Sequence, residues 1–267
     1  MIITKDFVYL HFPKSGGTFV TKWLSEAYRK DRAPSFDRST SYHKAKHKLL
    51  TYFPHLAGSV ASFEIRVFGL SSIFKHSPRS QIPAGYKKLP VVGVYRDPLK
   101  RWISQYNFRW HERTSTKSQW DDAIKVHYPQ YPKVANFTEF YEIRRRFFSN
   151  FQENLAVDER LGYQTEEFIA FYSSSPAELL KEGNALTIEK TLKTLKGVQL
   201  LETDTLNCDL AKHLREYGRN NTAMKVEAAS KELPEGIGNP DLRDIDIPSS
   251  LIRTIEREEA FLKELAK

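Results

Sequence analysis

The sequence contains a single cysteine, Cys208, in 267 residues, so the chain cannot form an internal disulfide. This usage fits a reducing compartment. No run of about 18 or more apolar residues occurs, so no transmembrane anchor is expected. Met1 is followed closely by the charged residues Lys5 and Asp6, which is not the layout of a signal peptide. These absences together predict a cytoplasmic protein.

Acidic side chains are fewer than basic ones, with 33 Asp and Glu against 41 Lys and Arg, which gives a formal net charge of +8. This balance favours anionic ligands in general. The chain has no zinc-finger spacing, no recognition-helix pattern and no aromatic RNA-binding motif, so a nucleic-acid partner is not expected. The length and the 40% hydrophobic content suit one domain over residues 1–267, although two smaller ones are not excluded.

The first informative segment is residues 7–18, F-V-Y-L-H-F-P-K-S-G-G-T. Its apolar start leads to Lys14, Gly16 and Gly17, and from Thr18 onward apolar residues recur at helical spacing. This order predicts a buried strand, a tight loop and an amphipathic helix, as at the first crossover of an α/β fold. Glycines let a ligand approach the backbone, while the lysine and the helix N-terminus supply positive charge. The segment therefore predicts an anion-binding loop, and the alternative is a glycine-rich turn that binds nothing.

The order of these residues differs from the common nucleoside-triphosphate loop, in which the lysine follows the glycines. Here Lys14 precedes both glycines, and P-K-S-G-G-T resembles instead the 5′-phosphosulfate loop of the sulfotransferases. These enzymes transfer a sulfuryl group from 3′-phosphoadenosine 5′-phosphosulfate (PAPS). The resemblance implies that Lys14 stabilises the oxygen that bridges sulfur and phosphorus. It also implies that the 5′-phosphate is held by Ser15, Gly16, Gly17 and Thr18, with Phe19 against the adenine.

A second informative segment begins with the β-branched run Val91–Tyr95, which predicts a central strand. Arg96 follows this strand directly. Asp97 is a good N-cap residue and Pro98 suits the first helical position, so the sequence predicts a helix that continues to about Arg109. Ligands of open α/β sheets bind at the carboxyl ends of strands, which is where this arginine is expected.

Arg101 and Ser104 lie three positions apart in the predicted helix and share a face. The sequence from Arg96 to Tyr106 matches R-[DN]-P-x-x-R-x-x-S-x-Y in full, which resembles the 3′-phosphate site of the sulfotransferases. The resemblance implies that Arg96 and Ser104 bind the 3′-phosphate of the donor, and an arginine beside a hydroxyl suits a phosphate dianion.

The candidate for a general base is His76, in the segment 74–83, F-K-H-S-P-R-S-Q-I-P. Many sulfotransferases place a catalytic histidine in a similar segment upstream of the arginine strand, and the resemblance implies this role for His76. Three other residues remain as alternatives: His43, His47 and Glu64.

His43 and His47 also have the i, i+4 spacing of metal ligands on a helix. Lysines surround both residues and no acidic partner of the H-E-x-x-H kind lies nearby, so a solvated basic helix is the favoured interpretation. Glu64 is interpreted as a partly exposed charge in a short strand or helix end at residues 60–70. No metal is expected.

The rest of the chain is interpreted from periodicity alone. The expected elements are helices at 137–155, 186–196, 204–217 and 249–266, a strand at 198–201, and a long loop at 218–248. Residues 111–135 are where an acceptor-binding insertion could lie, and the run Arg144–Arg146 is expected on a solvated helix face, although it could meet an acidic acceptor.

These observations predict an α/β fold with a central parallel sheet flanked by helices, of the P-loop-like sulfotransferase type. The expected activity is transfer of a sulfuryl group from PAPS to a hydroxyl of a saccharide, a lipid or a small molecule, with adenosine 3′,5′-bisphosphate (PAP) as the product. The alternative is a nucleotide-binding module or kinase of the P-loop class without sulfotransferase activity. The sequence identifies neither the acceptor nor the oligomeric state.

Overall fold

A computed structural model describes residues 1–30, 41–73, 76–109, 121–148, 160–181, 184–195, 197–229 and 245–265. The chain forms two compact units, and neither is continuous in sequence. The first unit comprises Met1–Tyr95, Phe171–Ser174 and Leu195–Glu232, and the second comprises Arg96–Ala170, Ser175–Thr194 and Leu233–Lys267.

The first unit contains a five-stranded sheet in the order β3-β1-β2-β4-β5. The strands are β1 (Ile2–Ile3), β2 (Val8–Tyr9), β3 (Ser71–Ser72), β4 (Val91–Tyr95) and β5 (Val198–Glu202). Strands β2, β4 and β5 are parallel, whereas β1 pairs antiparallel with both β2 and β3. The expected central parallel sheet is confirmed for β2, β4 and β5, whereas β1 runs in the opposite direction, so the sheet as a whole is mixed. The β1–β2 connection, closed by hydrogen bonds between Thr4 and Phe7, is too short for a parallel crossover.

The parallel core of the sheet follows the sequence prediction closely. Strand β4 is buried at every position and pairs with β2 on one side and with β5 on the other. The register places Val91 opposite Val8 and Val198. The predicted strands at 91–95 and 198–201 are confirmed. The pairing of β2 with β4 places the loop that follows β2 beside the central strand.

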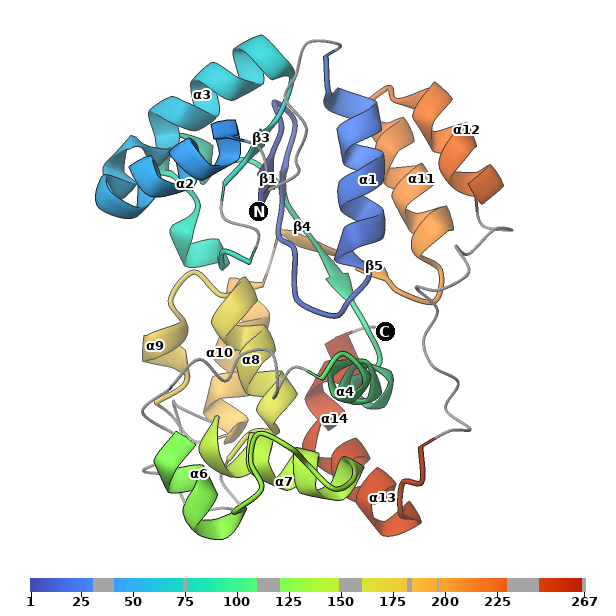
Figure 1. Cartoon of the computed structure of the whole chain (residues 1–267). Coiled ribbons are helices and arrows are strands. Elements are labelled where there is room, and N and C mark those ends of the chain that lie inside the picture. The colour runs from blue at the N-terminus through green and yellow to red at the C-terminus, as the bar shows by residue number, and fades with distance from the viewer. Residues whose placement is uncertain are drawn as a thin grey trace. The chain divides into compact units, whose positions relative to one another are not determined.

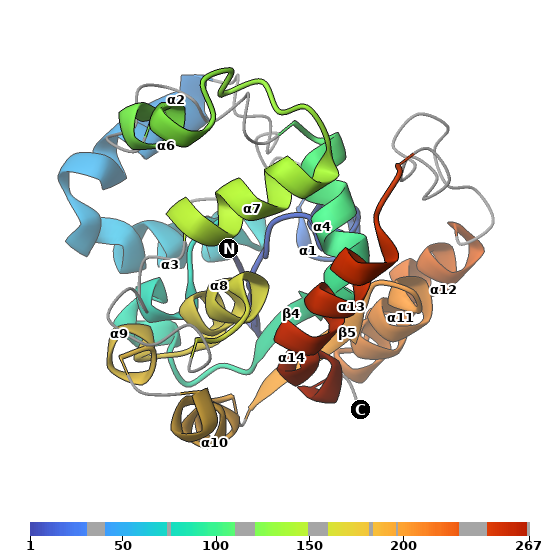
Figure 2. The same cartoon turned by 90° about the horizontal axis from the view of Figure 1, so that it is seen from below.

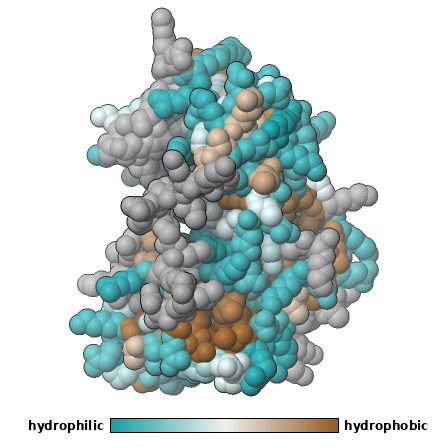
Figure 3. Space-filling view, turned by 90° about the vertical axis from the view of Figure 1, so that its right-hand side faces the viewer, coloured by the Kyte–Doolittle hydropathy of each residue, from teal (hydrophilic) through white to brown (hydrophobic). Residues whose placement is uncertain are grey.

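Helices flank this sheet (Figure 1). They are α1 (Gly17–Tyr28), α2 (Ser41–Tyr52), α3 (Ala57–Phe68), α11 (Leu206–Glu216) and α12 (Asn220–Ala228), with short 3-10 turns at Pro54–Leu56, Arg79–Gln81 and Ala84–Tyr86. Apolar residues of α1, α11 and α12 form one cluster with those of β2, β4 and β5. Figure 3 views the molecule from the side on which α11 and α12 lie, and it shows hydrophilic side chains over much of this face together with a group of hydrophobic ones in its lower half.

Helix α12 corrects the prediction of a continuous loop at 218–248. Ala223 and Val226 are fully buried, so packing against the sheet cluster stabilises a nine-residue helix that is too short to be stable by itself. Residues 230–244 of that predicted loop lie outside the described residues.

His213 of α11 is completely buried in the same unit, between the rings of Phe7 and Tyr217 at centroid distances of 4.5 and 5.1 Å. Neither ring nitrogen forms a hydrogen bond within the described residues. Burial lowers the pKa of His213 from 6.5 to about 4, because the protonated ring loses its hydration.

We expect the free energy of unfolding to fall as the pH drops from 7 to 5, because the unfolded chain takes up a proton that the buried ring of His213 refuses. The pH range over which His213 lowers the stability runs from its ordinary pKa of 6.5 down to its pKa in the folded chain, about 4. Urea denaturation at the two pH values should show that the wild type loses about 2 kcal/mol more than His213→Phe. The phenylalanine keeps the ring packing and cannot titrate.

The matched control is His55→Phe at an exposed position in the turn after α2. It should retain the full pH dependence of the wild type. If His213→Phe shows the same loss of stability as the wild type, the interpretation of a refused proton is wrong.

The second unit is helical. Its helices are α4 (Pro98–Asn107), α6 (Asp121–His127), α7 (Phe137–Phe147), α8 (Tyr163–Tyr172), α9 (Pro176–Leu179), α10 (Asn184–Thr194), α13 (Ser249–Glu258) and α14 (Ala260–Leu265), with Phe171 and Tyr172 at the end of α8 belonging to the first unit. Helix α4 contacts α7 and α13 (Figure 2), and Trp102 packs with Phe140 and Ile255 at their meeting point. No helix in the described ranges is long and apolar enough to cross a membrane.

The predicted helix at 249–266 is interrupted at Glu259, which separates α13 from α14. Its buried carboxylate accepts hydrogen bonds from the backbone N–H groups of Gln164 and Thr165, at 2.9 and 2.8 Å, and from the Thr165 hydroxyl at 2.7 Å. These groups belong to the first turn of α8, so Glu259 acts as an N-terminal cap supplied from elsewhere in the chain. Burial raises the pKa of Glu259 to about 7, although the three hydrogen bonds act in the opposite direction and lower it.

Candidate functional site

The predicted anion-binding loop lies between β2 and α1 in the first unit. The backbone N–H of Leu10 donates to the carbonyl of Val92 at 2.8 Å, which keeps the chain against β4 just beyond β2. Helix α1 begins at Gly17, one residue before the predicted start. The expected order of strand, loop and helix is therefore confirmed, and the loop occupies residues 13–16.

Two residues of the loop adopt left-handed backbone conformations. Lys14 has a φ of 64° and Gly16 a φ of 75°. A residue other than glycine loses roughly 1 kcal/mol or more in this region, and such outliers cluster at functional sites. The lysine predicted to act on the donor is thus held in a conformation that residues other than glycine adopt only rarely.

The two glycines are required for different reasons. Gly16 needs its positive φ, and a Cβ there would also lie 2.8 Å from Cδ2 of Leu206. A Cβ on Gly17 would lie 2.1 Å from Cδ2 of His11, well inside van der Waals contact. The predicted close approach at Gly17 is therefore real, but the group that approaches is the His11 ring.

Ser15 supplies the clearest sign of a ligand at this loop. Its side chain is 0% exposed, and its hydroxyl has no hydrogen-bond partner within the described residues. A buried hydroxyl without a partner loses free energy, typically 1–3 kcal/mol, unless another molecule completes it. The first turn of α1, next to it, carries no acidic side chain and no side-chain cap among the described residues. Both features suit an anion at this position.

The candidate base, His76, contacts the same segment. Its Nδ1 lies 3.0 Å from the carbonyl oxygen of His11, and the two imidazole rings are 4.9 Å apart in an edge-to-face arrangement. A carbonyl oxygen can only accept, so Nδ1 of His76 must carry a hydrogen. In the neutral ring the lone pair is then on Nε2, which is the form that a general base requires. The His76 side chain is exposed.

His11 was not among the residues predicted for the site. Its ring is buried against Gly17, and its Nδ1 lies 3.4 Å from the hydroxyl of Thr21, which itself donates to the carbonyl of Gly17 at 2.7 Å. The signal in the sequence was its place in the apolar run just before the loop, where a histidine stands among aromatic and aliphatic residues.

The alternative bases lie on the helix pair α2–α3. Glu64 is 3% exposed and sits in the middle of α3, so its interpretation as a partly exposed strand charge is wrong. Its carboxylate accepts from Lys46 at 2.7 Å, from the Tyr42 hydroxyl at 2.6 Å and from the Ser71 hydroxyl. Lys46, Tyr42 and Ser71 are 18, 22 and 7 residues away from Glu64 in sequence, and periodicity cannot reveal such partners. These three contacts to Glu64 connect α2, α3 and β3, and they occupy both oxygens of its carboxylate.

His43 and His47 lie on α2, as the basic-helix interpretation expected. His47 is exposed and contacts the hydroxyl of Thr51 at 3.5 Å. Within the parts of the chain that the structure describes, no three His, Cys, Asp or Glu side chains gather as metal ligands would.

The residues predicted to bind the 3′-phosphate belong to the second unit. The Asp97 side chain accepts from the backbone N–H of Lys100 at 3.0 Å, and Pro98 is the first residue of α4, so the predicted cap is confirmed. Arg96 and Ser104 are each 8% exposed. The structure thus places Arg96 directly before the cap residue of α4 and Ser104 within the second half of the same helix.

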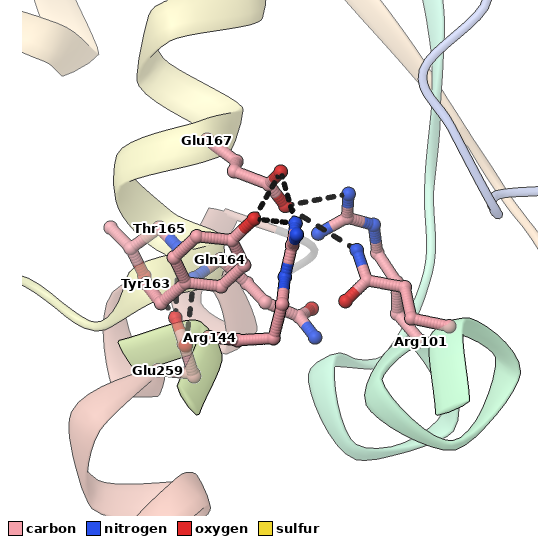
Figure 4. A network of polar contacts seen from close by, with 8 residues as sticks. Arg101, Arg144, Tyr163, Gln164, Thr165, Glu167 and Glu259 are labelled. Atoms are coloured by element: carbon pink, nitrogen blue, oxygen red, sulfur yellow. Dashed lines mark hydrogen bonds and ion pairs between the residues drawn. The ribbon is translucent and has the colours of Figure 1, made fainter. Parts of the chain in front are cut away.

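Arg101, the second arginine of the motif, has a different role. Its guanidinium group donates to Glu167 of α8 at 2.9 Å, and Gln105 contacts the same carboxylate at 3.4 Å. Figure 4 shows the guanidinium groups of Arg101 and Arg144 both turned toward Glu167. Burial opposes ionisation, but the two guanidinium groups hold the pKa of Glu167 below its ordinary value. Arg101 therefore joins α4 to α8.

Arg144 corrects the prediction that Arg144–Arg146 forms a solvated face. It is buried, donates to the Tyr163 hydroxyl and lies 3.7 Å from Glu167. Tyr163 in turn donates to Glu167 at 2.6 Å. Arg145 and Arg146 are exposed, as expected. A buried arginine needs a carboxylate, and here that partner comes from a helix that local sequence does not relate to α7.

Comparison with known proteins adds no relative to this description: no family, no curated protein and no solved structure matches the chain.

Proposed function

We propose that this chain is a sulfotransferase that moves a sulfuryl group from PAPS to an acceptor hydroxyl and releases PAP. The observation that carries the proposal is the loop at residues 13–16. It combines left-handed Lys14 and Gly16, the buried unpartnered hydroxyl of Ser15 and an uncapped helix N-terminus. The complete arginine–serine motif on the capped helix α4 supports it independently.

Each residue then has a defined task. Ser15 donates its buried hydroxyl to the 5′-phosphate, together with the backbone N–H groups of Gly16, Gly17 and Thr18. Lys14 stabilises the negative charge that grows on the bridging oxygen as its bond to sulfur breaks. The half-buried ring of Phe19 lies against the adenine.

The acceptor oxygen forms the new bond to sulfur while its proton passes to Nε2 of His76. The tautomer set by the His11 carbonyl leaves that nitrogen with the lone pair. His76 is preferred to Glu64, whose oxygens are engaged by Lys46, Tyr42 and Ser71. Arg96 and Ser104 bind the 3′-phosphate that distinguishes PAPS from other adenine nucleotides.

Thermal unfolding with PAP, compared with ATP plus Mg²⁺, tests the proposal against a kinase or general nucleotide-binding module. A ligand at about 100 times its Kd stabilises the folded state by about 2.7 kcal/mol, which is a measurable rise in Tm. We expect the rise with PAP and not with ATP plus Mg²⁺. The reverse pattern would support the kinase alternative.

Removal of the 3′-phosphate contact is expected to weaken PAP binding. Arg96→Ala should lose about 1.5–3 kcal/mol of PAP binding free energy, because a charged phosphate loses a hydrogen-bonding partner. Isothermal titration calorimetry measures the change. Arg253→Ala, at an exposed position of α13, is the matched control. An unaltered Kd for Arg96→Ala would remove this residue from the site.

Chelation of divalent ions is expected to leave turnover unchanged. The proposed step uses Lys14 and backbone N–H groups as the groups that stabilise negative charge, whereas phosphoryl transfer by kinases relies on Mg²⁺. Sulfuryl transfer should be measured with and without EDTA. A strict requirement for Mg²⁺ would contradict the proposal.

A further inference from the structure

The hairpin formed by α2, the turn Pro54–Leu56 and α3 exposes an unusual amount of apolar surface. Tyr52 is 69% exposed and Phe63 is 56% exposed, and three further large side chains on the hairpin are also exposed: Leu49, Phe53 and Val67. Elsewhere among the described residues, exposed large hydrophobic side chains stand singly on or beside different helices. The hairpin is therefore where apolar exposure is concentrated.

The exposed apolar side chains share one side of the hairpin. The two helices are antiparallel, because Lys46 pairs with Glu64 while Tyr42, one turn earlier, contacts Phe68, one turn later. Leu49 and Phe53 are one turn apart on α2, with Tyr52 beside them, and Phe63 and Val67 are one turn apart on α3. In an antiparallel pair, helical spacing places both sets on the same flank of the line where the helices meet. We call these five residues the apolar strip.

Cationic side chains border the apolar strip on both outer edges. Lys44 and Lys48 are exposed on the side of α2 away from α3, and Arg66 is exposed on the side of α3 away from α2. From Ser41 to Gly69, the acidic residue is Glu64, which is buried and paired with Lys46. The exposed surface of the hairpin thus presents positive charge and no carboxylate.

We propose that the hairpin docks on an anionic lipid surface, with the apolar strip entering the interface and the bordering cations contacting lipid phosphates. Aromatic and aliphatic side chains beside lysines and arginines are what an interfacial helix requires. Each lysine or arginine near an anionic surface adds about 1 kcal/mol of attraction. A second copy of the chain fits less well, because a symmetric contact through the same patch would bring the cationic borders together. This proposal does not rest on the sulfotransferase assignment.

Flotation with lipid vesicles, without nucleotide, tests the proposal on the full chain. We expect binding to vesicles of phosphatidylcholine with one third phosphatidylserine, and weak or no binding to phosphatidylcholine alone. Phe53→Ser combined with Phe63→Ser should lower the partition coefficient about tenfold or more, because two aromatic rings leave the interface. Lys44→Glu combined with Lys48→Glu should have an effect of similar or larger size.

The matched controls are Val126→Ser combined with Met224→Ser, which removes exposed apolar side chains elsewhere, and Lys212→Glu on α11. They should bind vesicles nearly like the wild type. Circular dichroism and Tm measurements check that each variant folds. We expect little change in either, because the substituted side chains are exposed. No binding to anionic vesicles, or equal losses in the controls, would overturn the proposal. A dimer in sedimentation that Phe53→Ser with Phe63→Ser dissociates, without vesicle binding, would show that the strip is a self-association surface instead.

Discussion

Replacing His76 by alanine is expected to slow sulfuryl transfer by about 10²- to 10⁴-fold while leaving the affinity for PAP unchanged. A hydroxyl is a weak nucleophile until a base receives its proton. The hydrogen bond from Nδ1 to the His11 carbonyl directs the lone pair of His76 to Nε2, so the ring is held ready to act as that base. The donor contacts of the proposal use other residues, and their binding energy should therefore survive.

The pH dependence separates a base from a merely structural residue. The wild-type rate should fall as the pH drops and the His76 ring becomes protonated, because the protonated ring cannot accept a proton. Single-turnover transfer measured from pH 5 to 9 should show this limb in the wild type and lose it in His76→Ala. Because His76 is exposed, added imidazole should restore part of the rate.

His55→Ala, another exposed histidine in the first unit, is the control and should retain both the rate and the pH profile. A near-normal rate for His76→Ala would assign the base to another residue. Glu64→Gln and His43→Ala would then be the variants to measure next.

Replacing Gly17 by valine is expected to abolish detectable PAP binding. A side chain at this position enters the space of the His11 ring, with Cβ only 2.1 Å from its Cδ2, so either the ring or the start of α1 must move. Moving the start of α1 displaces the N–H groups that the proposal assigns to the 5′-phosphate. Calorimetry with PAP measures the loss. Gly85→Val is the matched control, because a Cβ there meets nothing within 4 Å.

A compensating substitution shows whether the collision with His11 is the cause. Gly17→Ala alone should weaken PAP binding strongly, and His11→Ala in the same chain should restore most of it, because the methyl group then has room. Failure of the double variant to recover would mean that Gly17 is needed for closeness to the ligand itself. Normal PAP binding by Gly17→Val would show that this loop is not the 5′-phosphate site.

The parts of the fold that were predicted correctly depend on short-range signals. Asp97 and Pro98 mark a helix start by their own chemistry, and the β-branched run at 91–95 marks a strand buried on both faces. The loop was located because Gly16 and Gly17 stand between an apolar run and a helical pattern. The proximity of His76 to His11, in contrast, depends on how residues 65 positions apart are brought together.

The predictions that were wrong concern residues whose environment is decided by partners far away in sequence. Arg144 and Glu64 look like surface charges from their neighbours in sequence, and each is buried because an opposite charge from another helix meets it. Strands β1 and β3 consist of two residues each, too few for an alternating pattern to show. The unpartnered hydroxyl of Ser15 is a property of packing, and no sequence pattern reports it.

The pairing of β4 with β5 has a consequence for how the chain reaches its folded state. Val91 faces Val198, so all the residues from 96 to 197 must be synthesised before the central strand can gain its last neighbour. Closing so long a loop costs conformational entropy before the strand contacts can stabilise the chain. Topologies rich in contacts between residues far apart in sequence therefore fold slowly. A nascent chain stalled before residue 197 would present one open edge of an entirely apolar strand, which other strands can pair with. Rapid translation through the second unit, or a chaperone that shields that edge, would therefore limit aggregation during synthesis.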